Sequence, residues 1–337
     1  MVDRTVTAPT VGVEPPPAPA RSRWIVLVIL MTVIAVLPLV RGYGSYNYVL
    51  QLGTIALMWI AMTSSWNILG GYTGYISLGH NVFFGVGGYV AGLLLLELGW
   101  SPFVTAPLAG LFATLLGLIA GLITYRTHGP SFIISTIALL LVVTLLMDNW
   151  SYLGGSNGLS LPLAPFDVTW LKVPFYYAML VAAVGAVALG YRVQHSKFGL
   201  ALRAIASDEV KAEAAGISTR RFKVMAFALS AFFPGVVGAI WGYSLAYLRP
   251  VIFLLIAVAA RMVLMTIIGG RGTVAGPVIG AILVIFLDEA SVTLFGATEL
   301  NLVITGVLLI VTLLFFPLGI VGTLRERGRL PAWLDWD

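Results

Sequence analysis

Long apolar segments, separated by short polar breaks, fill almost the whole chain. A helix needs about 20 mainly apolar residues to cross a bilayer. About ten segments meet this requirement, and we predict a membrane-spanning helix in each. They are residues 24–41, 47–69, 82–98, 102–125, 130–150, 174–191, 222–246, 251–270, 275–296 and 300–317. The pattern therefore predicts an all-α membrane protein.

The two ends of the chain differ from the apolar segments. Residues 1–23 contain the proline-rich string VEPPPAPARSR and have few large apolar residues. Such a segment cannot bury a core, so we predict a disordered tail. No small-x-small cleavage pattern follows the first apolar segment, which is therefore expected to remain as a span. Residues 24–322 are interpreted as one membrane domain, and residues 323–337 as a second tail.

Composition excludes several classes of function. The chain is 59% hydrophobic and 10% charged, with a net charge of +5 and no cysteine. Thiolate catalysis, disulfides and cysteine metal sites are therefore excluded. The histidines and carboxylates show no spacing typical of a catalytic triad or a metal site, and no phosphate-binding glycine-rich loop occurs. We predict no catalytic residue, no metal and no nucleic-acid partner, and any ATP and magnesium would have to bind to another chain.

The positions of the Lys and Arg residues predict the orientation. The longest charged stretch is the loop 192–221. With this loop placed in the cytoplasm, 14 Lys and Arg fall on the cytoplasmic side and 3 on the other. Cytoplasmic loops carry an excess of Lys and Arg. The bias therefore predicts that both termini are cytoplasmic.

The middle of this loop has the pattern of a short helix. Ser207, Asp208 and Glu209 provide a cap and first-turn acids, the helix formers VKAEAA follow, and Gly216 ends the segment. About two turns of helix are not stable alone. Packing against this chain or against a partner must hold the helix. The charge pattern alone is also typical of a solvated loop helix.

Four strings carry a resemblance to a known family. EAAG at 213–216 resembles the EAA loop of ABC-importer permeases, and the wider string KFGLALRAIASDEVKAEAAGIS resembles the branched-chain amino acid permease family of the LivM type. LGGYTGYISLGHNVFFGVGGY (69–89), IIGGRGTVAGPVIGA (267–281) and ITGVLLIVTLLFFPLGIVG (304–322) agree with it in the same order. The resemblance covers nearly the whole chain after the N-terminal tail.

The resemblance implies a type II-like ABC importer permease in the bacterial inner membrane. The expected partners are a second homologous permease in a heterodimer, two cytoplasmic ATPase subunits that bind ATP and magnesium, an extracytoplasmic substrate-binding protein and membrane lipid. In that family a short cytoplasmic helix fits a groove on the ATPase and passes its motion to the spans. The coupling element implied here comprises Arg203, Asp208, Glu209, Glu213, Ala214, Ala215, Gly216 and Ile217.

Two glycine clusters interrupt the apolar pattern, at 70–79 and at 269–276. Broken helices commonly line the substrate path of transporters. We therefore consider Tyr75, Ser77, His80 and Asn81 as pathway candidates. Ordinary tight helix packing with a short turn would explain the same glycines.

Arg261 lies in the middle of a predicted span, where an arginine costs about 2.5–3.5 kcal/mol on insertion scales. It is expected to face a polar cavity or to pair with an acid, the candidates being Asp288, Glu289 and Asp148. We include Arg261 and Asp288 among the pathway candidates. A structural ion pair or a misplaced span boundary would also account for Arg261.

The sequence thus predicts the permease subunit of an ABC importer for branched-chain or related amino acids. An ion-gradient-driven secondary transporter of a small polar solute is the alternative, because glycine-broken helices and intramembrane acids suit both. An integral-membrane enzyme would need clustered His, Asp or Glu residues, and the sequence shows none. The exact substrate is left open among aliphatic and aromatic amino acids, urea and short amides.

Overall fold

The structure is a computed structural model that describes residues 32–40, 46–167 and 170–296, and parts of the segment 303–336, including 318–328. Eight helices in the described residues are long and apolar enough to cross a membrane. They correspond to eight of the predicted spans. The other two, 24–41 and 300–317, fall largely outside the described residues.

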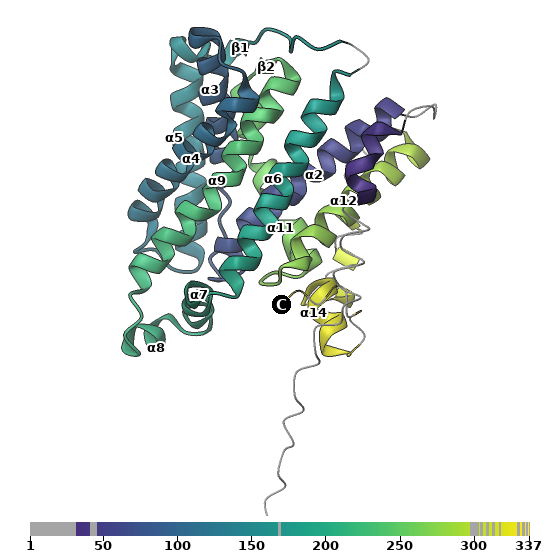
Figure 1. The fold of residues 1–337 in the computed structure, drawn as a ribbon. Coiled ribbons are helices and arrows are strands. Elements are labelled where there is room, and N and C mark those ends of the chain that lie inside the picture. The colour runs from purple at the N-terminus through teal and green to yellow at the C-terminus, as the bar shows by residue number, and fades with distance from the viewer. Residues whose placement is uncertain are drawn as a thin grey trace, which may run out of the picture.

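The long helices pack side by side in a bundle (Figure 1). In chain order the elements are η1 (Leu37–Leu39), α2 (Tyr46–Gly70), α3 (Asn81–Leu98), α4 (Pro102–Thr124), α5 (Pro130–Asn149), η2 (Ser151–Leu153), η3 (Gly155–Asn157), β1 (Leu159–Ser160), α6 (Lys172–Gln194), α7 (Lys197–Ser207), α8 (Glu209–Ala214), α9 (Thr219–Leu245), β2 (Tyr247–Leu248), α10 (Pro250–Phe253), α11 (Ile256–Gly269), α12 (Ala275–Phe295) and α14 (Gly319–Glu326).

Helix α9 lies at the centre of the bundle and packs closely against α3 and α4. Glycines allow the close approach. A Cβ on Gly238 would lie 1.9 Å from the carbonyl oxygen of Phe84, and a Cβ on Gly87 would lie 2.1 Å from that of Gly235. In a membrane, where lipid is as apolar as a leucine side chain, close backbone packing replaces the hydrophobic effect as the force between helices. The small residues therefore set the α3–α9 distance.

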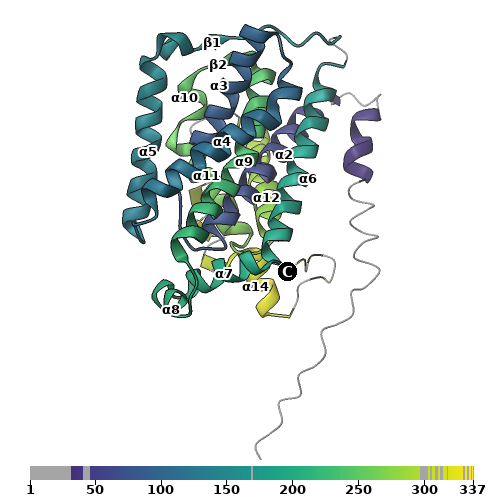
Figure 2. The same cartoon turned by 60° about the vertical axis from the view of Figure 1, so that its left-hand side comes forward.

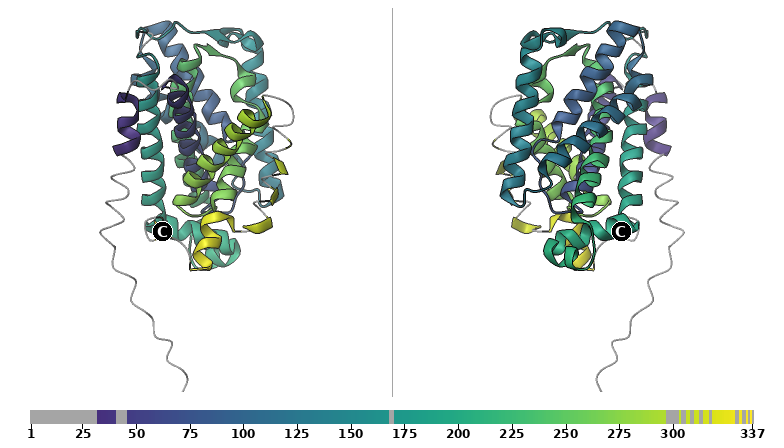
Figure 3. Two further views of the ribbon diagram at one scale, coloured as in Figure 1. Left: turned by 90° about the vertical axis from the view of Figure 1, so that its right-hand side faces the viewer. Right: turned by 90° about the vertical axis from the view of Figure 1, so that its left-hand side faces the viewer.

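The two ends of the bundle carry different elements. The short antiparallel pair β1–β2, in which Leu159 faces Leu248, lies at one end. Helices α7, α8 and α14 lie at the other end (Figures 1 and 2). The side views of Figure 3 show the same separation. The loop 192–221 that contains α7 and α8 is thus a projection beyond the spans.

The predicted span 251–270 is interrupted, which the sequence did not indicate. Helix α10 ends at Phe253, and Leu255 is extended with φ −66° and ψ 132° before α11 begins. The side chain of Asn81 donates to the carbonyl oxygens of Phe253 and Leu255, at 3.2 and 2.8 Å. Irregular backbone at membrane depth needs such internal partners. Asn81 therefore stabilises the break.

Candidate functional site

The predicted short helix of the charged loop is present as α8. The Asp208 side chain accepts a hydrogen bond from the backbone N–H of Lys211 at 3.1 Å and caps the helix N-terminus. Gly216 has φ +87°, a left-handed conformation that glycine adopts without strain. The N–H groups of Gly216 and Ile217 then bond to the carbonyls of Glu213 and Ala212. Both ends of α8 are therefore closed by local bonds, as the sequence predicted.

A second helix, α7, precedes α8 and was not predicted. It spans 11 residues, and Ser196 caps it by accepting a hydrogen bond from Gly199 N–H at 3.1 Å. Ala201, Leu202 and Ile205 are buried on one face. Their helical spacing is the signal that could have revealed α7. Arg203, a predicted coupling residue, lies on α7 and donates to the carbonyl of Gln194 at 3.1 Å.

The outer surface of α8 is small, exposed and partly apolar. Val210 is 77% exposed, and Glu213, Ala214, Ala215 and Gly216 are exposed as well. Ala212 is buried. Since small side chains let a second backbone approach closely, this surface could receive a partner. Four of the predicted coupling residues, 213–216, therefore share this exposed surface, whereas Glu209 is partly buried and Arg203 lies on α7.

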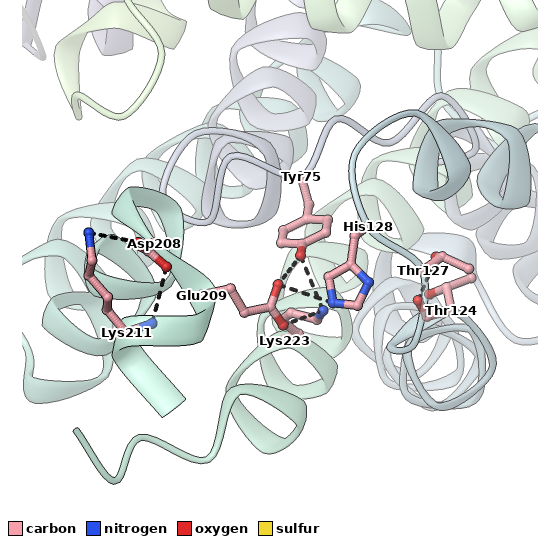
Figure 4. Close-up of polar contacts among 8 residues, drawn as sticks. All are labelled: Tyr75, Thr124, Thr127, His128, Asp208, Glu209, Lys211 and Lys223. Carbon is pink, nitrogen blue, oxygen red and sulfur yellow. Dashed lines mark hydrogen bonds and ion pairs between the residues drawn. The ribbon is translucent and has the colours of Figure 1, made fainter. Parts of the chain in front are cut away.

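One carboxylate holds the first turn of α8 against the spans (Figure 4). Glu209 pairs with Lys223 of α9 at 2.9 Å and accepts a hydrogen bond from the hydroxyl of Tyr75. His128, in the connection between α4 and α5, lies 3.4 Å from the same carboxylate. Lys223 also donates to the Tyr75 hydroxyl at 3.3 Å. We call Tyr75, His128, Glu209 and Lys223 the anchor cluster.

The anchor cluster includes one of the pathway candidates. The hydroxyl of Tyr75 bonds to Glu209 of the projection, and a pathway role for Tyr75 stays a prediction. Lys223 and His128 were not singled out. Lys223 lies near the start of a predicted span, where burying an unpaired charge costs free energy. Its position was therefore a signal that it has a partner. Nothing in the sequence around His128 pointed to Glu209.

The surroundings of the anchor cluster favour a charged carboxylate and a neutral phenol. Burial opposes ionisation of Glu209, but the hydrogen bonds from Tyr75 and Lys223 and the positive charge of Lys223 outweigh it and hold the pKa of the carboxyl below its usual value. Burial, followed by the hydrogen bond to Glu209 and its negative charge, raises the pKa of Tyr75 above its usual range. Tyr75 therefore remains a hydrogen-bond donor to an ionised Glu209.

The other residues of the first glycine cluster lie inside the helix packing. Ser77, His80 and Asn81 are each 0% exposed. His80 contacts the hydroxyls of Ser77 and Ser230 at 3.1 and 2.8 Å, through different ring nitrogens. The neighbourhood is a connected polar network between the α2–α3 connection and α9. The pathway role of these residues stays a prediction.

A single asparagine joins the end of α2 to the second glycine cluster. Asn67, at the end of α2, donates to the carbonyl of Thr273 at 2.9 Å and accepts from the N–H of Gly272 at 2.8 Å. It is 2% exposed. The last turn of α2 is therefore bonded to the α11–α12 connection at the end of the bundle that carries the projection.

Arg261 pairs with Asp288, one of the three acids considered. The pair joins α11 to α12, and the guanidinium also lies 5.2 Å from the ring centre of Trp59 on α2. The next residue, Glu289, accepts a hydrogen bond from Tyr48. The predicted pairing is confirmed, while a part in the pathway stays a prediction.

Eight span-length helices in the described residues, with a capped helical projection at one end, define a multi-pass membrane protein. The chain belongs to the family described as Branched-chain amino acid transport system / permease component, whose model matches residues 47–313.

Curated relatives agree with the family. The chain is 24% identical over 90% of its length, and 76% of the relative, to the high-affinity branched-chain amino acid transport system permease protein LivM of Escherichia coli K12. It is 26% identical to LivH of the same organism, over 82% of this chain and 94% of LivH. The ribose import permease protein RbsC of Haemophilus influenzae is 29% identical over 60% of this chain and 64% of RbsC. No solved structure matches the chain.

The protein is therefore an ABC importer permease subunit, a multi-pass protein of the inner membrane. This excludes the secondary transporter that the residues alone left open. Within the described residues, no group of three His, Cys, Asp or Glu residues could hold a metal ion.

Proposed function

We propose that this subunit imports branched-chain or related amino acids, together with a second homologous permease. Two ATPase subunits would supply the energy, and an extracytoplasmic binding protein would deliver the solute. The similarity to LivM over 90% of the chain supports this substrate class, because the ribose permease matches over only 60%. The similarity to LivH as well as LivM supports a heterodimer of related permeases.

The observation that carries the proposal is the way α8 is held. A helix that transmits motion from one subunit to another must be rigid and firmly joined to its own subunit. Helix α8 is closed at both ends, by Asp208 and Gly216, and Glu209 bonds it to three other segments of the chain. The exposed surface of α8 includes Val210 and Glu213. We infer that this surface meets a cytoplasmic ATPase, with both chain termini in the cytoplasm.

The experiment is co-purification of the ATPase subunits with a tagged permease. Glu213→Lys and Gly216→Pro are expected to abolish ATPase retention while the protein still inserts into the membrane. Glu97→Lys is the matched control, because it makes the same charge reversal at an exposed residue at the end of α3, far from the projection. Retention of the ATPases by both α8 variants would contradict the proposal.

A transport assay tests the energy source separately. Proteoliposomes that contain the whole complex, with the ATPase subunits facing the lumen, should accumulate leucine when ATP is enclosed in the lumen. Proteoliposomes with this chain alone should show no uptake under a proton or sodium gradient. Gradient-driven uptake by the chain alone would overturn the proposed mechanism.

A further inference from the structure

A polar cavity of about 620 Å³ lies at the end of the bundle that carries the projection. Helices α7 and α14 both contribute to its lining. The side chains that carry charge or polarity into it include His195, Ser196, Lys197, Arg203 and Arg325. Lys197 and Arg203 are cationic at neutral pH, and both line the cavity. The cavity therefore favours an anion.

The start of α7 adds to this preference. Ser196 is the N-cap of α7 and Lys197 is its first residue, and both line the cavity. The backbone N–H groups at a helix N-terminus carry a partial positive charge that favours anions, phosphate groups above all. The helix end and the cationic side chains come from separate parts of the chain, since Arg325 belongs to α14. They converge on one space.

The position of the cavity relates it to the membrane surface. Helix α6 is a candidate span that ends at Gln194, and Gln194 and His195 line the cavity. Tyr191, which is 43% exposed on α6, lies 4.3 Å from the His195 ring, centre to centre. Leu200, which lines the cavity, is 63% exposed. Apolar side chains thus adjoin the cationic cavity at the level where a span ends and lipid headgroups lie.

We propose that this cavity binds a phosphate-bearing anion, and that the exposed apolar side chains beside it favour the headgroup of an anionic phospholipid as the source. Basic pockets between helices at the cytoplasmic side of a membrane commonly take such headgroups. The site differs from the exposed surface of α8 and implies nothing about the transported solute.

The test measures binding of phosphatidylglycerol to the detergent-purified complex by native mass spectrometry, with phosphatidylcholine as the zwitterionic comparison. Each Lys or Arg near a membrane surface contributes roughly a fivefold change in affinity for anionic lipid. Lys197→Gln and Arg325→Gln are therefore each expected to weaken phosphatidylglycerol binding about fivefold. Arg221→Gln is the matched control, because Arg221 is exposed at the same end and does not line the cavity.

A competition experiment identifies the source of the anion, and several results would contradict the proposal. Inorganic phosphate that displaces the lipid, at constant ionic strength set with chloride, would support the phosphate site and show that free phosphate also occupies it. Phosphatidylglycerol binding that is equal in the unaltered protein and in a protein that carries both Lys197→Gln and Arg325→Gln would overturn the proposal. So would an equal loss in Arg221→Gln, or equal binding of phosphatidylcholine. Binding seen only when the ATPases are absent would overturn it too, since the cavity would then be an ATPase contact.

Discussion

Glu209 and Lys223 form an ion pair, 2.9 Å from Oε1 to Nζ, that joins the first turn of α8 to the first turns of α9. The side chain of Lys223 is 6% exposed and that of Glu209 is 17% exposed. Removing one partner of a buried pair leaves an uncompensated charge, whereas removing both does not. The pair therefore determines how firmly the projection is attached.

A double-mutant cycle measures this attachment. Glu209→Gln and Lys223→Met should each destabilise the protein strongly, by about 3 kcal/mol where the remaining charge is buried. The double variant should lose less than the sum of the two. Thermal denaturation in detergent provides the comparison. Lys211→Met is the control, because the Lys211–Asp208 pair is exposed and such pairs contribute little. Additive losses would show that Glu209 and Lys223 are not coupled.

The contribution of Glu209 to the free energy of unfolding should decrease as the pH falls. The pKa of its carboxyl is held below the usual value of 4.5, so the folded state binds its proton less readily than the unfolded state. The contribution is therefore complete above pH 4.5 and is lost as the pH falls through the folded-state value. The difference in melting temperature between the unaltered protein and Glu209→Gln should be large at pH 7 and should shrink below pH 4.5. An equal difference at both pH values would contradict this assignment.

Asn67→Ala should weaken the link between the end of α2 and the α11–α12 connection. The change leaves the N–H of Gly272 and the carbonyl of Thr273 without their partner at a site where Asn67 is 2% exposed. Each unsatisfied buried group costs about 1–3 kcal/mol. The melting temperature of Asn67→Ala should therefore fall strongly. Asn149→Ala, which removes an exposed side-chain hydrogen bond on α5, should change the melting temperature little. Similar losses in the two variants would argue against the link.

Gly238→Ala should force α3 and α9 apart. The added Cβ would lie 1.9 Å from the carbonyl oxygen of Phe84, which is backbone and cannot rotate away. Overpacking of this kind typically costs about 1–3 kcal/mol. Gly190→Ala on α6 is the control, because its Cβ would meet only the Tyr72 hydroxyl, at 3.8 Å. Detergent-extracted yield and melting temperature should fall for Gly238→Ala alone.

Arg261 offers a test of the pathway prediction that separates folding from transport. Arg261→Met leaves Asp288 without its cationic partner and should lower both protein level and uptake. Arg261→Met combined with Asp288→Leu should restore the protein level, because no lone charge is left. If the pair contacts the solute, leucine uptake per complex stays low in the double variant. Normal uptake in that variant would assign the pair a structural role only.

Local features of the chain predicted much of the fold. Eight of the predicted spans are present because twenty apolar residues in a row have few stable alternatives to a membrane helix. Helix α8 was predictable from the residues at its two ends. Asp208 caps the helix that begins at Glu209, and Gly216 follows its last residue, Ala214, by two positions. Such signals act over one or two helical turns. They can be read without knowledge of the rest of the chain.

The sequence by itself therefore determined the membrane-helical class, the family and the short helix of the projection. Only the tertiary structure decided how these parts are joined. Glu209 meets Tyr75 across 134 positions, Asn67 meets Thr273 across 206, and Asn81 supports the α10–α11 break across 172. The physical reason is that a buried polar group must find a partner, and the partner is chosen by which helices pack together and not by nearness along the chain.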